Sequence, residues 1–254
     1  MNVADNLLDA IENQARRGEV VAIVRVLHPS AAKNTTVRVC DGKLVPPIAE
    51  RNLADQIRGA VRGLIARGGI ADLIEATDEK GSRVRLAVEV VRPKLELVVF
   101  GAGHVGQAVA TIAALIGYHV TVIDDREEFA SRTRLPDPRI ELLVSDYASA
   151  AGKLTISSNT AVVIVTRGHQ YDELCLKNVI GSRATYIGMI GSRRRVLSVF
   201  KKVAGEGVSE QDLQNVHAPI GLRIGARSPQ EIAISIVAEI INHVNNPAHR
   251  HQGE

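Results

Sequence analysis

A glycine-rich turn between an apolar strand and a helix is the feature that most limits how this chain can fold. In the segment of residues 95–125, LELVVFGAGHVGQAVATIAALIGYHVTVIDD, the residues Gly101, Gly103 and Gly106 have the spacing G-x-G-x-x-G. The first glycine permits a tight turn, the second lets a phosphate approach the backbone, and the third lets helix and strand pack closely. A helix beginning near His104 would present its free N–H groups to that phosphate. The spacing predicts a site for a nucleotide or phosphate.

Two acidic residues, Asp124 and Asp125, end the next predicted strand. They lie about 20 residues beyond the loop, where a carboxylate suits a ribose diol and repels a 2′-phosphate. The alternative is that the glycines serve only the packing of helix on strand. His104 is likewise either a contact of the phosphate, with the capacity to act as an acid, or an exposed residue at the start of a helix.

The remainder of the chain after residue 92 alternates apolar strands with helices. The expected strands are ELVVF, YHVTVID, IELLV, AVVIVT and TYIGMI. Near-continuous apolar runs of this kind are typical of a parallel sheet covered on both faces. The fold class expected for residues 93–246 is therefore α/β, a doubly wound, mostly parallel sheet. Ser228, Pro229 and Glu231 mark the start of its final helix with a capping box, and residues 247–254 are expected to form a flexible tail.

Residues 1–92 are expected to form a smaller α+β domain. Helices are predicted over residues 2–17 and 50–69, and the Asp41-Gly42 turn predicts a hairpin. The other predicted strands are VVAIVRVL, TTVRVC, IADLIEA and RVRLAVEVV. Pro93 interrupts the last strand, so residues 91–94 are expected to link the two domains.

Two further polar segments follow predicted strands of the larger domain, at the edge of a parallel sheet where ligands bind. The first, TRGHQYD, contains Thr166, Arg167, His169 and Asp172. His169 titrates near neutral pH and Asp172 could orient it. The alternative is that Asp172 caps the next helix and that Arg167 pairs with a surface acid.

The second segment, GSRRR, begins at Gly191 and continues with Ser192 and Arg193. A glycine followed by serine at a helix start forms an anion nest, and arginine donates bidentate hydrogen bonds to phosphate. A solvated basic helix face is the alternative. We expect one or two of the three arginines to reach a ligand.

Composition narrows the function classes. Aromatic residues make up 3% of the 254 residues and the net charge is +3, so neither a base-stacking surface for nucleic acid nor a polybasic face is expected. Cys40 and Cys175 lack the spacing of a zinc site or a disulfide framework, which favours a reducing, cytoplasmic setting. No apolar run approaches the roughly 20 residues that span a bilayer.

Four ordered blocks carry a resemblance to a known family. The blocks VVFGAGHVGQAVA, VTRGHQYD, YIGMIGSRRR and PIGLRIGARSPQEIAISIVAEI resemble the Rossmann-like C-terminal domain of the xanthine dehydrogenase accessory (XdhC/CoxI) family. The match runs over residues 91–244. The N-terminal half is divergent: LHPSAAKN stands where family members have Gly-Ser-x-Pro-Arg, and no Cys-Gly-Gly element precedes the linker.

The resemblance implies a maturation factor rather than a dehydrogenase. Such a protein binds the molybdenum cofactor, as molybdopterin or its dinucleotide, while a cysteine desulfurase installs its sulfido ligand, and delivers it to an apo-molybdenum hydroxylase. The glycine loop and Asp124 would hold the nucleotide-like part, and Thr166, His169, Ser192 and Arg193 would line the opposite rim. Two alternatives stay open, an NAD(H)-dependent oxidoreductase and a ligand-regulated binding module without catalysis. A homodimer is expected from the uncovered strand edges of the small domain.

Overall fold

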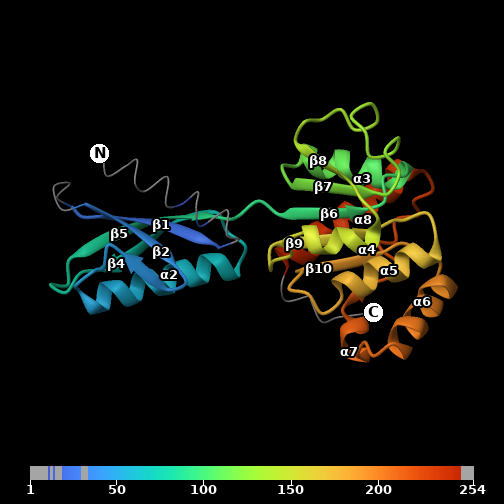
Figure 1. Ribbon diagram of the computed structural model, residues 1–254. Coiled ribbons are helices and arrows are strands. Elements are labelled where there is room, and N and C mark those ends of the chain that lie inside the picture. Colours follow the sequence, from blue (N-terminus) through green and yellow to red (C-terminus); the bar gives the residue numbers. More distant parts are fainter. Residues whose placement is uncertain (1–10, 12–13, 15–18, 30–33, 247–254) are drawn as a thin grey trace. The chain divides into compact units, whose positions relative to one another are not determined.

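The computed structural model describes residues 11, 14, 19–29 and 34–246 (Figure 1). The chain divides into two compact units, Met1–Pro93 and Lys94–Glu254, and each is described by itself. The predicted helix over residues 2–17 lies largely outside the described residues, although Ile11 and Gln14 are helical. The predicted tail, residues 247–254, also lies outside them.

Among the described residues, the N-terminal unit is an antiparallel sheet with helix α2 (Arg51–Ala66) packed on one of its faces (Figure 1). The strands lie side by side in the order β3-β2-β1-β5-β4. Along the chain, the elements are β1 (Val21–Leu27), β2 (Thr35–Cys40), β3 (Lys43–Val45), α2 (Arg51–Ala66), β4 (Ala71–Thr77) and β5 (Arg83–Val91).

Residue alternation explains this arrangement. Along β5, exposed and buried side chains alternate, so one face of the strand is apolar, as in a sheet covered on one side. Leu53, Ile57 and Leu64 form a buried stripe on α2 and pack against that face. Helix α2 ends before Gly68, which has a φ of +72°. The helix predicted over residues 50–69 and the strands predicted in this unit lie within a few residues of their expected bounds.

The C-terminal unit is built on six parallel strands in the order β11-β10-β9-β6-β7-β8. The chain moves outward in one direction from β6 and then in the other from β9, so a switch point lies between these two strands. The elements are β6 (Glu96–Phe100), α3 (His104–Leu115), β7 (His119–Asp124), β8 (Ile140–Val144), α4 (Tyr147–Ala150), η2 (Ala151–Lys153), β9 (Thr160–Ile164), α5 (His169–Val179), β10 (Tyr186–Met189), α6 (Arg193–Gly205), α7 (Glu210–Gln214), β11 (Val216–His217) and α8 (Pro229–Asn245).

Helices cover both faces of this sheet. Leu97 and Val99 of β6 pack in the cluster that contains α3 and α8. Val98 and Phe100, which point the other way, pack in the cluster that contains α4, α5 and α6. Both sets of side chains are buried, which explains why the strand reads as a continuous apolar run. The prediction of an α/β, doubly wound fold is confirmed.

The sixth strand is missing from the sequence-based expectation. β11 contains only Val216 and His217, which pair with Ile187 and Gly188 of β10. Two residues form no apolar run that periodicity could detect. The connection from β7 to β8, residues 125–139, consists of turns rather than a helix.

The start of α8 has the predicted capping box. The Ser228 hydroxyl accepts a hydrogen bond from the Glu231 N–H, and the Glu231 side chain accepts one from the Ser228 N–H. Pro229 occupies the first turn, where its missing N–H would have had no partner within the helix. Because α8 packs along α3, its start also supports the helix that follows the glycine loop.

We predict that Ser228→Ala lowers the free energy of unfolding by about 1 kcal/mol, because an N–H of the first turn loses its acceptor. Urea denaturation monitored by circular dichroism measures this change. Ser198, an exposed serine within α6, provides the control, and Ser198→Ala should leave stability nearly unchanged. Equal effects of the two substitutions would contradict the capping role of Ser228.

Candidate functional site

The three glycines between β6 and α3 have different surroundings. Gly101 has a φ of +107°, and a Cβ atom on it would lie 2.5 Å from the carbonyl oxygen of Val165. A Cβ on Gly106 would lie 1.8 Å from the carbonyl oxygen of Gly101. At Gly103, by contrast, no atom of the described residues lies within 4 Å of the Cβ position. Gly101 and Gly106 therefore let backbones touch, whereas Gly103 leaves room for a ligand.

The start of α3 is suited to an anion. Gly103 is the N-cap residue and has no side chain to accept hydrogen bonds from the first turn. The N–H groups of this turn and the positive end of the helix dipole therefore favour a negative group. Gln107 fixes the loop from within the helix, because its side-chain amide donates to the Ala102 carbonyl over 2.8 Å. His104, the first helical residue, is exposed.

Asp124 holds the glycine loop in place through a hydrogen bond. Its side chain is fully buried, and its Oδ2 accepts the Ala102 N–H over 2.8 Å. The Arg126 guanidinium binds both carboxylate oxygens, over 2.9 and 3.0 Å. Burial raises the pKa of Asp124, but the hydrogen bonds from Arg126 and Ala102 outweigh it and hold the pKa below its ordinary value. Asp124 was predicted to contact a ribose, but both of its carboxylate oxygens are thus already hydrogen-bonded within the protein.

Arg126 is a site residue that our sequence reasoning missed. It stands two positions after Asp124, beyond a bend at residue 125 that follows the end of β7. An arginine two residues after an acid was a usable signal for an ion pair, but the sequence does not show that the chain bends there. The Arg126 guanidinium also lies 3.6 Å from the centre of the Phe129 ring, which holds it in place.

Asp125 forms a second ion pair, this time with Arg167. An Arg167 nitrogen donates to Asp125 Oδ2 over 2.8 Å, and the same nitrogen lies 2.9 Å from the Tyr171 hydroxyl. The other oxygen, Asp125 Oδ1, is buried without a hydrogen-bond partner among the described residues. This pairing matches the alternative in which Arg167 contacts an acid, and that acid belongs to the predicted site.

Thr166 connects the loop after β9 to two helices. Its hydroxyl donates to Asp172 Oδ1 over 2.5 Å, and the other Asp172 oxygen accepts the Arg195 guanidinium. Asp172 is fully buried, so this carboxylate links the β9 loop, α5 and α6. His169 begins α5, but its side chain lies outside the described residues.

The loop after β10 also begins a helix. The Ser192 hydroxyl accepts the Arg195 N–H over 3.3 Å and so caps α6. Of the three arginines, Arg195 turns inward to Asp172, whereas Arg193 and Arg194 are exposed. No partner for these two side chains is recorded within the described part of the chain. Gly191 precedes the cap and is partly exposed.

The predicted residues lie at one edge of the sheet. The glycine loop follows β6, the two aspartates stand at the end of β7, and Thr166 and Arg167 follow β9. These three strands are neighbours, with β6 in the middle. Gly191, Ser192 and Arg193 follow β10, one strand farther out. The edge therefore combines an uncapped helix start with exposed Arg193 and Arg194, which favours an anionic ligand, whereas Arg126, Arg167 and Arg195 are already paired with carboxylates.

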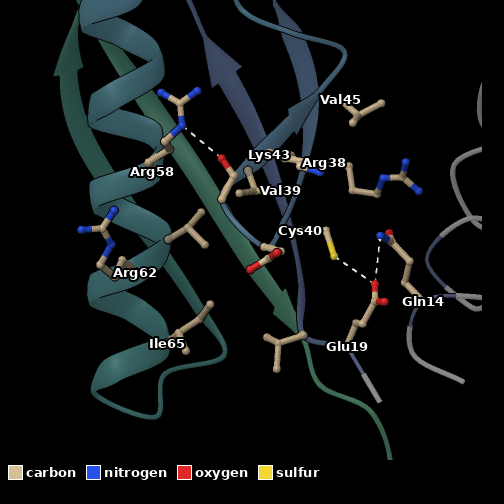
Figure 2. A pocket seen from close by; sticks show the side chains of 14 residues that line it. Gln14, Glu19, Arg38, Val39, Cys40, Lys43, Val45, Arg58, Arg62 and Ile65 are labelled. Carbon is tan, nitrogen blue, oxygen red and sulfur yellow. Dashed lines mark hydrogen bonds between the residues drawn. The ribbon is translucent and has the colours of Figure 1, made fainter. Parts of the chain in front are cut away.

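A cavity of about 730 Å³ lies in the N-terminal unit and is lined by residues of that unit, not by the glycine loop (Figure 2). Its basic side chains come from the β2–β3 hairpin and from α2. Figure 2 shows Cys40 and Gln14 both directed at the Glu19 carboxylate. The named polar and basic lining residues are Gln14, Glu19, Arg38, Cys40, Asp41, Lys43, Arg58 and Arg62.

Cys40 is the thiol of this cavity. Its Sγ donates to Glu19 over 3.2 Å. Burial and the Glu19 carboxylate raise the pKa of the Cys40 thiol, so the reactive thiolate is disfavoured. The other cysteine, Cys175, is fully buried under the larger sheet, and burial raises its pKa strongly.

Two features are absent from the described residues. No group of three or more His, Cys, Asp or Glu side chains in this part of the chain is placed to hold a metal ion. Within the same residues, no helix combines the length and the apolar character that crossing a membrane requires.

A parallel sheet in this strand order, with a glycine loop at the start of its first helix, defines a domain of the Rossmann class. The family model of the XdhC Rossmann domain matches residues 97–240. The chain belongs to this family, as the four sequence blocks predicted.

Three relatives are similar over more than half of this chain. The Escherichia coli K12 protein named "Uncharacterized protein YqeB" is 35% identical over 184 residues, which are 72% of this chain and 33% of that protein. A probable xanthine dehydrogenase subunit of Bacillus subtilis 168 is 29% identical over 61% of this chain and 44% of its own length. "Molybdenum cofactor insertion chaperone PaoD" of Escherichia coli K12 is 24% identical over 59% of this chain and 40% of its own length. The matched region is thus less than half of each relative.

One solved structure is similar across nearly the whole chain. It is a Bacillus halodurans protein described as a xanthine dehydrogenase, with a TM-score of 0.72 and 23% sequence identity. The match covers 96% of this chain and 68% of that one. At this level of identity, the likeness concerns the fold.

We predict that Arg126→Met lowers the free energy of unfolding at pH 7 by about 3 kcal/mol, because it leaves the Asp124 carboxylate buried without its main partner. In the wild type, Asp124 stabilises the fold above its ordinary pKa, and this contribution disappears as the pH falls through the lowered folded pKa. In the variant, only the backbone N–H groups of residues 102 and 126 still oppose burial, so the pKa of Asp124 is higher than in the wild type. The gap between the two proteins should therefore narrow as the pH falls toward about 4.

Urea denaturation at pH 7 and pH 4.5 measures both effects. Arg139→Met is the matched control, because Arg139 pairs with Asp137 on the exposed surface of the same unit. Loss of that pair should cost about 0–1 kcal/mol. If Arg126→Met costs no more than the control, Asp124 does not depend on Arg126.

We also predict that Glu19→Gln accelerates alkylation of Cys40 by iodoacetamide at pH 7 by about threefold, because the pKa of the thiol falls and more thiolate is present. The reason is that the carboxylate raises the Cys40 pKa through its hydrogen bond and its charge. Mass spectrometry of the native protein follows the reaction, with buried Cys175 as the unreactive internal reference. An unchanged rate would contradict the role of Glu19.

Proposed function

We propose that this chain is an accessory factor that binds the molybdenum cofactor, or a related nucleotide, and assists maturation of a molybdenum hydroxylase of the xanthine dehydrogenase type. The observation that carries the proposal is the open start of α3 at Gly103, at the switch point of an XdhC-family domain. The names of two relatives, a molybdenum cofactor insertion chaperone and a probable xanthine dehydrogenase subunit, support it.

The residues at this edge fit the phosphate end of such a ligand. The cofactor ends in a phosphate, or in a pyrophosphate when it is a dinucleotide. The N–H groups of the first turn of α3 would bind this anion, and the missing side chain of Gly103 lets it approach. When bound, the cofactor carries the molybdenum centre on which the target hydroxylase depends.

Side chains around the loop would orient the rest of the ligand. Arg167 lies beside the loop, and exposed Arg193 lies one strand farther out. Because Asp124 is committed to Arg126 and Ala102, we assign the ribose contact of a dinucleotide form to Asp125 instead. Ser192 caps α6, so its part in the site is to hold the start of that helix.

The partners follow from the same proposal. The recipient would be an apo-molybdenum hydroxylase, and a cysteine desulfurase would install the sulfido ligand while the cofactor is held. The chain itself would supply binding and shelter rather than catalysis. A homodimer of this chain remains a prediction from the strand edges of the N-terminal unit.

A nicotinamide dinucleotide is the competing ligand, because its pyrophosphate would use the same helix start. The two ligands are separated by what co-purifies with the protein. Oxidation of a bound molybdenum cofactor gives a fluorescent pterin, whereas NAD gives none. An NAD-dependent oxidoreductase would in addition show turnover that requires nicotinamide.

We therefore expect the full chain to retain pterin when purified from cells that make the molybdenum cofactor, and none from cells blocked in its synthesis. The Gly103→Ala variant should fold normally but retain about tenfold less pterin, because its methyl group occupies the space of the phosphate, at a cost of about 1.4 kcal/mol. Chromatography of the oxidised extracts measures both amounts.

Gly205→Ala is the matched control. Gly205 ends α6, at the edge of the sheet opposite the loop, and no atom of the described residues lies within 4 Å of its Cβ position. This variant should retain pterin at the wild-type level. If the wild type carries no pterin and does not activate the apo-enzyme, the proposal is wrong.

A further inference from the structure

The ion pair between Asp125 and Arg167 crosses the carboxyl end of β6. In the sheet, β6 lies between β7 and β9, so the two outer strands are about 10 Å apart. Asp125 directly follows β7 and Arg167 comes three residues after β9. Their contact of 2.8 Å therefore spans the strand that leads into the glycine loop.

Arg167 contacts Tyr171 in the same position in which it pairs with Asp125. Its guanidinium lies 4.7 Å from the centre of the Tyr171 ring, and one of its nitrogens contacts the Tyr171 hydroxyl. The side chains of Arg167 and Asp125 are 36% and 23% exposed, so water and salt weaken their attraction. A phosphate, which accepts paired hydrogen bonds from a guanidinium, competes well with such a carboxylate.

Asp125 has an oxygen that accepts no hydrogen bond. Its Oδ1 is buried, has no hydrogen-bond partner among the described residues, and lies 3.9 Å from Arg126 Nε, beyond hydrogen-bond distance. A buried acceptor without a hydrogen bond costs free energy, and a donor on a bound ligand would remove this cost. Arg167 occupies the other oxygen, Oδ2, so both oxygens of Asp125 can accept from a ligand only after Arg167 has moved. The neighbouring Asp124 offers no alternative, since both its oxygens are bonded.

We propose that Asp125 and Arg167 form a latch that selects ligands carrying a ribose diol next to a diphosphate. The diphosphate binds at the start of α3 and takes Arg167 from Asp125, and the freed carboxylate accepts the ribose hydroxyls. This inference rests on the proposed function and makes it narrower. The dinucleotide form of the cofactor fits both halves of the latch, whereas the monophosphate form, which has no ribose, fits only one.

Calorimetric titration of the full chain tests the latch with three probes, inorganic pyrophosphate, ADP and 2′-deoxy-ADP. The wild type should bind ADP about fivefold more tightly than 2′-deoxy-ADP, since the deoxy probe lacks one donor to Asp125. Asp125→Asn should bind pyrophosphate about fivefold more tightly than the wild type, because Arg167 is no longer held by a charge. The same variant should lose most of the preference for ADP.

Arg167→Met should change pyrophosphate affinity in the opposite direction to Asp125→Asn. It therefore also tests the latch if Asp125→Asn is unstable. It should weaken pyrophosphate binding by about tenfold while the preference for ADP over 2′-deoxy-ADP persists. Asp137→Asn is the matched control, because it breaks a comparable exposed ion pair, with Arg139, just before the amino end of β8. Its titrations should match those of the wild type, and thermal unfolding checks that all variants are folded.

The outcomes separate the latch from the function on which it rests. If the wild type binds the probes but Asp125→Asn binds pyrophosphate no more tightly, or Arg167→Met no more weakly, the latch is wrong and the phosphate site stands. If neither the wild type nor any variant binds any probe, the start of α3 is not a phosphate site. The proposed function then fails together with the latch.

Discussion

The close contact between Gly101 and Gly106 is the constraint on which the rest of the larger unit depends. The backbone of α3 rests against the carbonyl of Gly101, and Gly101 in turn touches the loop that follows β9. Three elements thus meet where any side chain would separate them. Because of this contact, the first turn of α3 stands over the carboxyl edge of the sheet, with Gly103 facing open space. The buried Asp124 then fixes the same loop through the Ala102 N–H.

Much of this arrangement could be predicted from the sequence because it depends on local patterns. Continuous apolar runs indicated strands that are buried on both faces, and Ser228, Pro229 and Glu231 marked the start of α8. The strand β11 was not predictable in this way, since it has two residues and exists only through its pairing with β10. Similarly, the alternation along β5 predicted a sheet with one covered face.

The site was predicted less completely, because spacing does not reveal which partner a polar group already has. The pattern predicted an acid at the end of β7 that contacts a ligand. In the structure, Asp124 is paired with Arg126, and one oxygen of Asp125 accepts no hydrogen bond from the described residues. In the same way, the run of three arginines after Ser192 showed basic character. Only packing distinguishes Arg195, which pairs with buried Asp172, from the exposed Arg193.

The candidate anion site at Gly103 consists of backbone N–H groups, which limits how its ligand preference could change among relatives. A change of residue type cannot retune a backbone N–H, and the two flanking glycines tolerate no replacement without moving the helix. Under the proposed function, ligand selectivity would therefore reside in the neighbouring strand ends, at residues 124–126 and 165–168. We expect proteins of this family that handle different cargoes to keep the loop and to differ at those two short segments.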